Sequence, residues 1–412
     1  MSSKVKKKIL KLKESSTLVI NEKSKELISE GKKVYQFGFG QSPFPVPEKI
    51  VETLKKNAHR KEYLPIQGLP ELRENISKYL SKRTGNDYPK ENILITPGSK
   101  EAMLLIHIAF NGEIIIPAPG WVSYEPQAVI GSNKVHWIET SRENNWFPTG
   151  KELEKKIKSV GKNRNLILIL NSPNNPSGAV CKNLEELAKI AKKYKIMILS
   201  DEIYTDLTFS NEYKSISTFY PELTFITGGL SKWCGAGGWR LGFLAVPKKL
   251  TEFLKSLKSL ASESYSTVNT PTQYASVEAY AHEHDLYKLK VRAILKAVGN
   301  YVYNNLKSNK VLIAPPQGAF YLMPEFKNKK YKTSSELCEA ILDETGVAML
   351  PGSDFGFKPK KMLTRLSYTD FDGIEFFKNV TNCKMIDDDM IKKYAPNVVE
   401  GVSKLSNWVK NL

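Results

Sequence analysis

Long apolar runs and cysteine are both scarce in this sequence of 412 residues. No run reaches about 18 apolar residues, so we expect no transmembrane helix and no membrane partner. The four cysteines, at positions 181, 234, 338 and 383, are scattered and form no CxxC pair. This usage argues against a disulfide framework or a zinc site and favours reduced thiols in a cytoplasmic protein. The lysine-rich stretch 1–14 lacks a continuous apolar segment, so we interpret it as an exposed basic arm, not a secretory signal.

Acidic residues are few relative to basic ones, with 43 Asp and Glu against 61 Lys and Arg and a formal net charge of +18. Such a balance is compatible with nucleic-acid binding. However, the lysines are spread along expected helical faces such as 151–158 and 189–195, without a recognition motif of interleaved aromatic residues. We therefore expect a solvated basic surface, no nucleic-acid partner, and at most a steering of anionic substrates toward a site.

Short apolar segments alternate with helical patterns through the first two thirds of the chain. Near-continuous apolar strands separated by helices are typical of an α/β fold whose mostly parallel sheet is covered by helices on both faces. The expected strands are 93–95, 113–116, 135–138, 166–170, 196–199, 223–226 and 243–246.

The pattern changes near residue 290, and the chain is long enough for two domains. We expect a helix over 285–306 and then short strands at 311–313, 319–322 and 363–368, which is the profile of a smaller α+β domain. Near the N-terminus we expect a helix over 15–31, a short strand at 34–37 and, at prolines 43, 45 and 47, a connector. These features predict a large domain of residues 48–290 and a small domain built from 1–47 and 291–412.

The segment from Gly228 to Phe243 is the most informative part of the sequence. It places Lys232 among small residues between two expected strands, with Arg240 eight positions later. A lysine amine can form a Schiff base with an aldehyde cofactor, and an arginine can hold the cofactor's phosphate through two parallel hydrogen bonds. Taken alone, the segment could also be a glycine-rich connection with incidental charges.

Polar residues also follow other expected strands, where open α/β sheets bind their ligands. Gly98, Ser99 and Lys100 open a helix, and backbone N–H groups at such a start, with the Ser99 hydroxyl, can hold a phosphate. Asn175 lies in a proline-rich turn, and Asp201 follows a buried strand. Each of these could instead be a plain turn residue or helix cap.

Together the segments resemble, in order from about residue 15 to residue 370, the aspartate-aminotransferase-like family of pyridoxal-phosphate enzymes. Trp121, Tyr63 and Arg365 lie in three further segments that match the family. The resemblance implies the fold type I architecture, a large domain with a mostly parallel sheet plus a smaller α+β domain. It also implies pyridoxal 5'-phosphate as cofactor and the activity of an aminotransferase.

The resemblance implies a role for each matching residue. Lys232 forms the Schiff base and moves the substrate proton, while Asp201 keeps the pyridine nitrogen protonated. Tyr204 and Asn175 match donors to the phenolic oxygen, and Arg365 matches the clamp for the α-carboxylate. Further cofactor contacts are expected at Gly98, Ser99, Lys100, Trp121, Ser231 and Arg240. Tyr63 matches a tyrosine that reaches the cofactor phosphate of the neighbouring subunit, which implies a homodimer.

Two segments depart from the family pattern. Gly229 stands three positions before Lys232, where many members have a phosphate-binding serine, so Thr227 or Ser231 could supply that hydroxyl. The segment Gly40–Phe44 reads GQSPF where relatives usually read GEPDF. Because this segment lies near the substrate in the family, specificity could differ here.

The resemblance implies an amino acid as substrate with a 2-oxo acid as acceptor, and we expect an acidic donor. Since no arginine lies between Arg240 and Arg292, Lys100 is the candidate partner for a distal carboxylate. The segment 15–21 is similar to one that closes on this carboxylate in bacterial aspartate/prephenate-type aminotransferases. We therefore expect aspartate or glutamate as donor and 2-oxoglutarate or oxaloacetate as acceptor, bound by Gly40, Lys100, Asn175 and Arg365.

Other functions stay open at this stage. The donor could be an aromatic or other neutral amino acid, or the enzyme could be a lyase on the same fold. The basic charge would also suit a nucleic-acid-binding protein on an inactive enzyme scaffold. No metal site is expected, because the spacing of His282 and His284 would separate their rings by roughly 200° on a helix.

Overall fold

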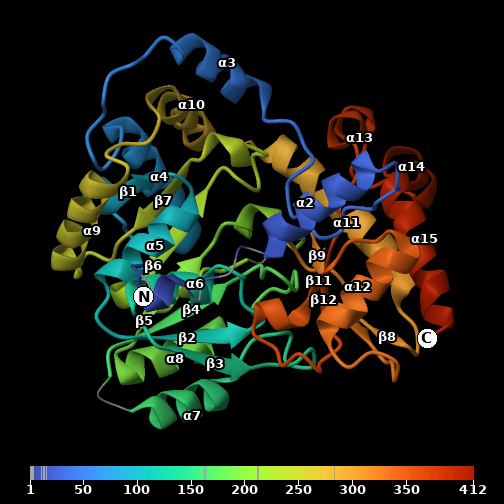
Figure 1. Ribbon diagram of the computed structural model, residues 1–412. Coiled ribbons are helices and arrows are strands. Elements are labelled where there is room, and N and C mark those ends of the chain that lie inside the picture. Colours follow the sequence, from blue (N-terminus) through green and yellow to red (C-terminus); the bar gives the residue numbers. More distant parts are fainter. Residues whose placement is uncertain are drawn as a thin grey trace.

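A seven-stranded sheet forms the centre of the computed structural model, in the order β1-β7-β6-β5-β4-β2-β3 (Figure 1). β7 runs antiparallel to both neighbours and the strands from β6 to β3 pair in parallel, so the expected mostly parallel sheet is confirmed. The strands are β1 (Ile93–Thr96), β2 (Glu113–Ala118), β3 (Val135–Glu139), β4 (Leu166–Asn171), β5 (Met197–Asp201), β6 (Thr224–Gly229) and β7 (Gly242–Ala245). The structure describes residues 4–10, 12, 14, 16–161, 164–210, 213–282 and 284–412, so Lys11 and Lys13 of the basic arm lie outside it.

Helices cover both faces of the sheet because the central strands are apolar at successive positions. Ile167 and Ile169 of β4 pack with α5 (Ser99–Ala109), α6 (Tyr124–Gly131) and α9 (Thr251–Ser264). Alternate side chains of a strand point to opposite faces, so Leu166, Leu168 and Leu170 belong to the other core. That second face is covered by α7 (Gly150–Val160), α8 (Leu184–Tyr194), α4 (Pro70–Thr84) and α10 (Thr270–Ala281), and α3 (Glu48–Asn57) packs on α10.

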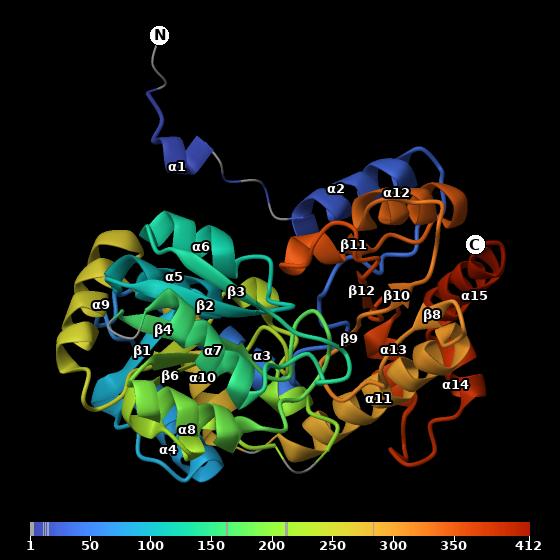
Figure 2. The ribbon, with the colours of Figure 1, turned by 90° about the horizontal axis from the view of Figure 1, so that it is seen from below.

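A second part of the molecule is built on two small sheets (Figure 2). These consist of β9 (Tyr321–Leu322), β11 (Leu350–Pro351) and β12 (Thr364–Ser367), and of β8 (Val311–Leu312) with β10 (Glu325–Phe326). The helices here are α11 (Asp285–Leu306), α12 (Ser334–Thr345), α13 (Gly373–Asn379), α14 (Asp388–Tyr394) and α15 (Pro396–Lys410). The N-terminal helix α2 (Ser16–Ser29) contacts β11, and Tyr35 forms a bridge with Val347. Segments from both ends of the chain therefore lie together.

The short N-terminal helix α1 (Lys7–Leu10) lies apart from α2, against the large-sheet part of the molecule. The Lys8 ammonium donates to the backbone carbonyl of Ile130 at 2.7 Å and to the Ser132 hydroxyl at 2.6 Å. This contact places a positive charge at the carboxyl end of α6, where it interacts favourably with the helix dipole.

Most expected elements are confirmed, and α11 has the bounds that the sequence predicts. Several strands extend past their predicted bounds or stop short of them by one to three residues. Two predictions lose half or more of the expected strand. The segment at 34–37 makes a single bridge, because the Phe37 amide donates back to the Tyr35 carbonyl and interrupts the ladder. The strand expected at 319–322 begins at Tyr321, because Ala319 has a φ of 53°, outside the extended region.

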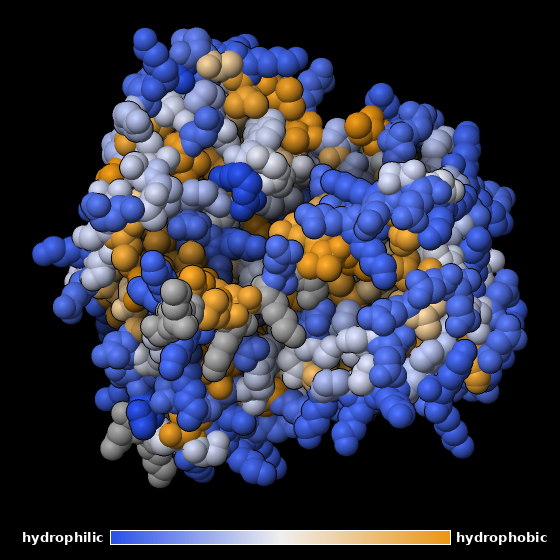
Figure 3. Space-filling model, in the orientation of Figure 1, coloured by the Kyte–Doolittle hydropathy of each residue, from blue (hydrophilic) through white to orange (hydrophobic). Residues whose placement is uncertain are grey.

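In the described ranges, no helix combines the length and the apolarity needed to cross a bilayer. The face in Figure 3 is mainly hydrophilic, as expected for a lysine-rich solvated surface, with apolar groups gathered toward a hollow near its middle.

Candidate active site

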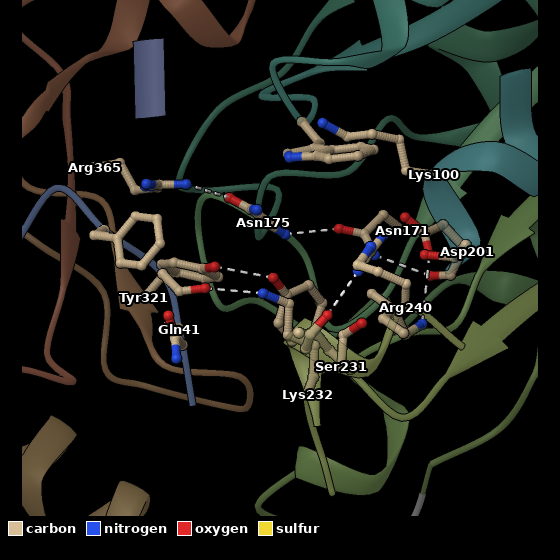
Figure 4. A pocket seen from close by; sticks show the side chains of 18 of the residues that line it. Gln41, Lys100, Asn171, Asn175, Asp201, Ser231, Lys232, Arg240, Tyr321 and Arg365 are labelled. Atoms are coloured by element: carbon tan, nitrogen blue, oxygen red, sulfur yellow. Dashed lines mark hydrogen bonds between the residues drawn. The ribbon is translucent and has the colours of Figure 1, made fainter. Parts of the chain in front are cut away.

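The carboxyl ends of the sheet strands border a cavity of about 470 Å³ (Figure 4). The start of α5 after β1 supplies Ser99 and Lys100, and Asn171 and Asp201 end their strands. The loops after β2, β4, β5 and β6 supply Trp121, Asn175, Tyr204, Ser231 and Lys232. Arg240 precedes β7, which runs in the opposite direction and therefore begins at the same edge. Gly40, Tyr321 and Arg365 approach from the part of the molecule that holds the small sheets.

Lys232 points into this cavity from the loop after β6. Its ammonium donates to the Gly40 carbonyl at 2.8 Å and lies 5.5 Å from the ring centroid of Tyr204. Burial lowers the pKa of the Lys232 amine to about 8, and the positive charges of Arg365 and Arg240 act in the same direction. A neutral, nucleophilic amine is therefore available at a much lower pH than for a free lysine.

Asp201 ends β5 on the floor of the cavity and is 3% exposed. Its carboxylate accepts hydrogen bonds from the hydroxyl of Tyr124 at 2.7 Å and from that of Thr227 at 3.3 Å. Burial nevertheless raises the pKa of Asp201 from 3.8 to about 6. A cationic group placed against this carboxylate would favour its ionised form, which burial makes costly.

The first turn of α5 and Arg240 form the basic end of the cavity. Arg240 has a φ of 54°, and its guanidinium donates to the carbonyls of Gly237 at 2.8 Å and Pro97 at 3.1 Å. These bonds hold it against Gly98, where an added Cβ would overlap the guanidinium. Unpaired N–H groups of a helix start beside an arginine are a suitable site for a phosphate.

Contacts in the structure favour one hydroxyl group of the lysine segment over the others as a candidate phosphate contact at the basic end of the cavity. A Cβ at Gly229 would lie 2.6 Å from the Leu241 carbonyl, so no serine fits there. The Thr227 hydroxyl donates to Asp201, away from the phosphate end. Ser231 lines the cavity and is the better placed of the two alternatives.

Arg365 extends from β12 to the opposite side of the cavity and is 1% exposed. Its two terminal nitrogens donate to the Asn175 side-chain oxygen at 3.1 Å and to the Gly38 carbonyl at 2.5 Å. No protein group of the described residues accepts from its Nε, although this atom is buried. A buried guanidinium with donor capacity to spare suits a planar anion such as a carboxylate.

Lys100 is a further basic side chain of the cavity, beside Lys232, Arg240 and Arg365. Its ammonium lies 5.1 Å from the centroid of the Trp121 ring, so the two side chains lie together. Burial lowers the pKa of Lys100, and the charge of Arg240 adds to this effect. The lysine is therefore partly desolvated and faces the space that a ligand would fill.

The cavity brings together most of the site residues that the sequence predicts. Those lining it are Gly40, Ser99, Lys100, Trp121, Asn175, Asp201, Tyr204, Ser231, Lys232, Arg240 and Arg365. Gly98 lies just outside the lining, behind Arg240. Tyr63 is 89% exposed and does not line the cavity of its own chain. Of the segment 15–21, Leu18 lines the cavity, and Ser15 lies outside the described residues.

Sequence reasoning missed several residues of the site. Phe39, Asn171, Ile203 and Tyr321 line the cavity, and Tyr124 supports Asp201 from outside it. Asn171 donates to the Asp201 carbonyl at 2.9 Å and accepts from the Asn175 amide at 2.7 Å, so it links two predicted residues. Its place at the end of a buried strand, directly before the asparagine turn, was a usable signal.

Comparison with known proteins identifies the class of this enzyme. Residues 32–373 match the family described as aminotransferase class I and II. The chain belongs to this family, and it is a transaminase that acts on amino acids and 2-oxo acids with pyridoxal phosphate as cofactor.

Individual relatives cover nearly the whole chain. It is 33% identical to the aspartate aminotransferase of Geobacillus stearothermophilus, over 90% of this chain and 96% of that protein. It is also 33% identical to aromatic-amino-acid aminotransferase 2 of Thermococcus litoralis, over 81% and 87% of the two chains. The structure of Thermus thermophilus aspartate aminotransferase with maleate aligns with a TM-score of 0.85 and 26% identity, over 98% of this chain and 99% of that one. The fold type I architecture is thereby confirmed.

The residues of the cavity fit pyridoxal phosphate. Among the described residues, four basic side chains line it, those of Lys100, Lys232, Arg240 and Arg365, against the one carboxylate of Asp201. This excess of positive charge suits a phosphate together with a substrate carboxylate. The buried Asp201, in turn, suits a protonated ring nitrogen.

Proposed function

We propose that this transaminase takes its amino group from aspartate or glutamate and passes it to 2-oxoglutarate or oxaloacetate. The supporting observation is the number of cationic positions in the cavity. Arg240 with the start of α5 suits the cofactor phosphate, and Arg365 suits the α-carboxylate. Lys100 is then available to bind a second carboxylate of the substrate. With a monocarboxylic donor, Lys100 would have no anionic partner in the cavity.

The substrate would be held at two ends. Arg365 would bind the α-carboxylate with its planar fork, beside Asn175 and the backbone of Gly40. Lys100 would meet the distal carboxylate in the same partly dry cavity, with Leu18 and Trp121 covering the carbon chain. The aspartate aminotransferase from Geobacillus stearothermophilus among the relatives supports this choice of donor.

Each catalytic side chain then has a defined task. Pyridoxal phosphate, when bound, supplies the electron sink for breaking a bond at the substrate Cα. Lys232 would hold the cofactor and, as a neutral amine, carry the proton of Cα. Asp201 would keep the ring nitrogen protonated, and Tyr204 would donate to the phenolic oxygen. Ser99, Ser231, Arg240 and the backbone at Gly98 would bind the phosphate, and Trp121 would stack on the ring.

A panel of amino donors tests this proposal. The purified holoenzyme would be mixed with aspartate, glutamate, alanine or phenylalanine, and the cofactor spectrum would report the first half-reaction. We expect kcat/KM for the two acidic donors to exceed that for alanine, with full turnover on adding 2-oxoglutarate to the aspartate reaction or oxaloacetate to the glutamate reaction. Continuous release of a keto acid beyond one equivalent per active site, without any acceptor, would instead indicate a lyase.

A second candidate donor class is aromatic amino acids. Phe39, Trp121 and Tyr321 line the same cavity, and the Thermococcus litoralis relative is named an aromatic-amino-acid aminotransferase. Phenylalanine would outperform aspartate in the panel if this candidate is right.

We also propose a homodimer with sites completed across the interface. Tyr63 is exposed although its loop is well held, since Thr270 donates to the Glu62 carbonyl at 2.6 Å and Arg60 stacks on Tyr274 at 4.1 Å. An exposed, fixed tyrosine is suited to reach into a neighbouring subunit.

The remaining proposals concern organisation and location. We propose a large domain of residues 48–290 and a small domain of 1–47 with 291–412, supported by the bridge between Tyr35 and Val347. The boundary then falls within α11, which joins the two parts.

We further propose a cytoplasmic location, because the cysteines are unpaired and three of the four are buried.

A further inference from the structure

The hydroxyl groups of Tyr204 and Tyr321 lie 2.9 Å apart inside the cavity wall. Tyr204 follows β5 of the large sheet, whereas Tyr321 begins β9 of a small sheet. We propose that Tyr321 is a positioning residue, which donates to Tyr204 and thereby directs the Tyr204 proton toward the phenolic oxygen of the cofactor. This inference deepens the proposed function and rests on it for the role of Tyr204.

Tyr321 is held tightly by its neighbours. β9 pairs with β12, so Ser367 lies opposite Tyr321 on the strand that carries Arg365. The Arg365 guanidinium lies 4.8 Å from the centroid of the Tyr321 ring. An added Cβ at Gly40 would overlap the Tyr321 hydroxyl, and one at Gly178 would overlap its carbonyl. Both glycines thus allow a close approach that fixes where the hydroxyl points.

The direction of the hydrogen bond follows from counting protons. A tyrosine hydroxyl has one proton to donate and can also accept. If Tyr204 gave its proton to Tyr321, none would remain for a ligand in the cavity. If Tyr321 donates instead, Tyr204 is free to donate inward, and the accepted bond strengthens that donation.

A bound cofactor would favour the second arrangement. Burial raises the pKa of Tyr204, and Tyr321 and the charge of Asp201 add to this effect against the opposing charge of Arg365, so the hydroxyl stays protonated. A bound phenolic oxygen would be the strongest acceptor within its reach. Tyr321 also contacts the ring of Phe320, at 4.7 Å between centroids, and lies beside Arg365, so it links the carboxylate clamp to the cofactor end.

The test compares Tyr321→Phe, Tyr204→Phe and the double variant, each loaded with pyridoxal phosphate. The control is Tyr368→Phe, which removes another buried hydroxyl of the region, one that donates to the Ala319 carbonyl outside the cavity. The first measurement is the pH titration of the visible absorbance of the bound cofactor. Hydrogen bonding to the phenolate form favours deprotonation, so weakening it raises the midpoint.

We expect the midpoint to rise by about half a pH unit in Tyr321→Phe and further in Tyr204→Phe. The double variant should match Tyr204→Phe, because Tyr321 acts through Tyr204. Tyr368→Phe should titrate as the unaltered protein does. A lowered midpoint in Tyr321→Phe would mean that Tyr204 donates outward, and an unchanged one would mean that the bond has no such role. Either result would overturn the proposal, as would additive effects.

A second measurement separates positioning from folding. We expect Tyr321→Phe to lower kcat/KM about 3- to 10-fold with acidic donors, with little change when Tyr204 is already Phe. The titration needs no donor, so it tests Tyr321 even if the acidic-donor proposal fails. Failure of the unaltered holoenzyme to prefer acidic donors would count against the proposed function and leave the titration result standing.

Discussion

Tyr124 donates a hydrogen bond to the Oδ2 atom of Asp201 across 2.7 Å, joining the start of α6 to the end of β5. The Tyr124 ring also contacts that of Trp121, with centroids 5.5 Å apart. Tyr124 therefore contacts both Trp121, expected to stack on the cofactor, and Asp201, expected to bind the cofactor nitrogen. One shared neighbour thus helps to position both side chains.

The buried Asp201 should make the apoprotein less stable as the pH rises. Its folded pKa of about 6 exceeds 3.8, so the unfolded chain loses the proton first and stability falls between about pH 4 and pH 6. Above pH 6 we expect the free energy of unfolding of apo Asp201→Asn to be about 3 kcal/mol higher than that of the unaltered apoprotein. Below pH 4 the ionisation of Asp201 should make no difference between the two. Urea unfolding of both apoproteins from pH 4 to 8 measures the difference.

Asp206→Asn is a control for which the effect on the pH dependence of stability should have the opposite sign. Asp206 is partly buried, yet Lys288 and Arg83 outweigh the burial and lower its pKa. The unaltered protein should therefore gain stability relative to Asp206→Asn as the pH rises through the acid range. Equal pH slopes for the two variants would contradict the environment described for Asp201. In the holoenzyme, Asp201→Asn should instead slow the half-reaction.

The lowered pKa of Lys232 predicts how the apoprotein takes up pyridoxal phosphate. The rate should rise with pH through a midpoint of about 8, because the neutral amine is the reactive form. Borohydride should then fix the cofactor at Lys232, and Lys232→Ala should abolish this fixation and lower turnover by orders of magnitude. Lys248→Ala, at an exposed lysine paired with Asp87, should behave as the unaltered protein does. Fixation at another lysine would refute the assignment.

Substitution of Lys100 should change the activity with acidic donors much more than the activity with neutral donors. Its removal should leave a distal carboxylate unpaired in a partly dry cavity, at a cost of roughly 2–4 kcal/mol. Lys100→Ala should therefore lower kcat/KM for aspartate and glutamate roughly 30- to 1000-fold and change it little for alanine or phenylalanine. A uniform loss across all donors, together with weaker cofactor binding, would assign Lys100 to the phosphate end instead.

Tyr63 tests the composite site of the proposed homodimer. Mixing inactive Tyr63→Phe subunits with inactive Lys232→Ala subunits should restore activity, because each hybrid dimer contains one site with both residues intact. Size-exclusion chromatography and a subunit-exchange control would establish that hybrids form. Hybrids no more active than the parents would show that each subunit is self-contained.

The sequence predicted the sheet and the lysine end of the site well, since apolar runs mark buried strands and the residues after them gather at one edge. Tyr321 escaped notice because it lies in Ala319–Leu322, an apolar run in which an aromatic residue is normally part of the core. Its partner Tyr204 lies 117 residues away, and such a pairing follows only from how β9 meets the large sheet. Tyr124 was missed for the same reason, as a helix start without a visible partner.

The two donated bonds of Arg365 connect residues as far as 327 positions apart in the chain, from Gly38 through Asn175 to β12. Three separate segments must therefore meet before the carboxylate fork exists, whereas the phosphate end needs, within one subunit, the large-sheet edge alone. Affinity for a dicarboxylate thus reports the assembly of the whole molecule, and affinity for a phosphate reports that of one part. A protein whose two parts have partly separated should lose its affinity for a dicarboxylate while keeping its affinity for a phosphate.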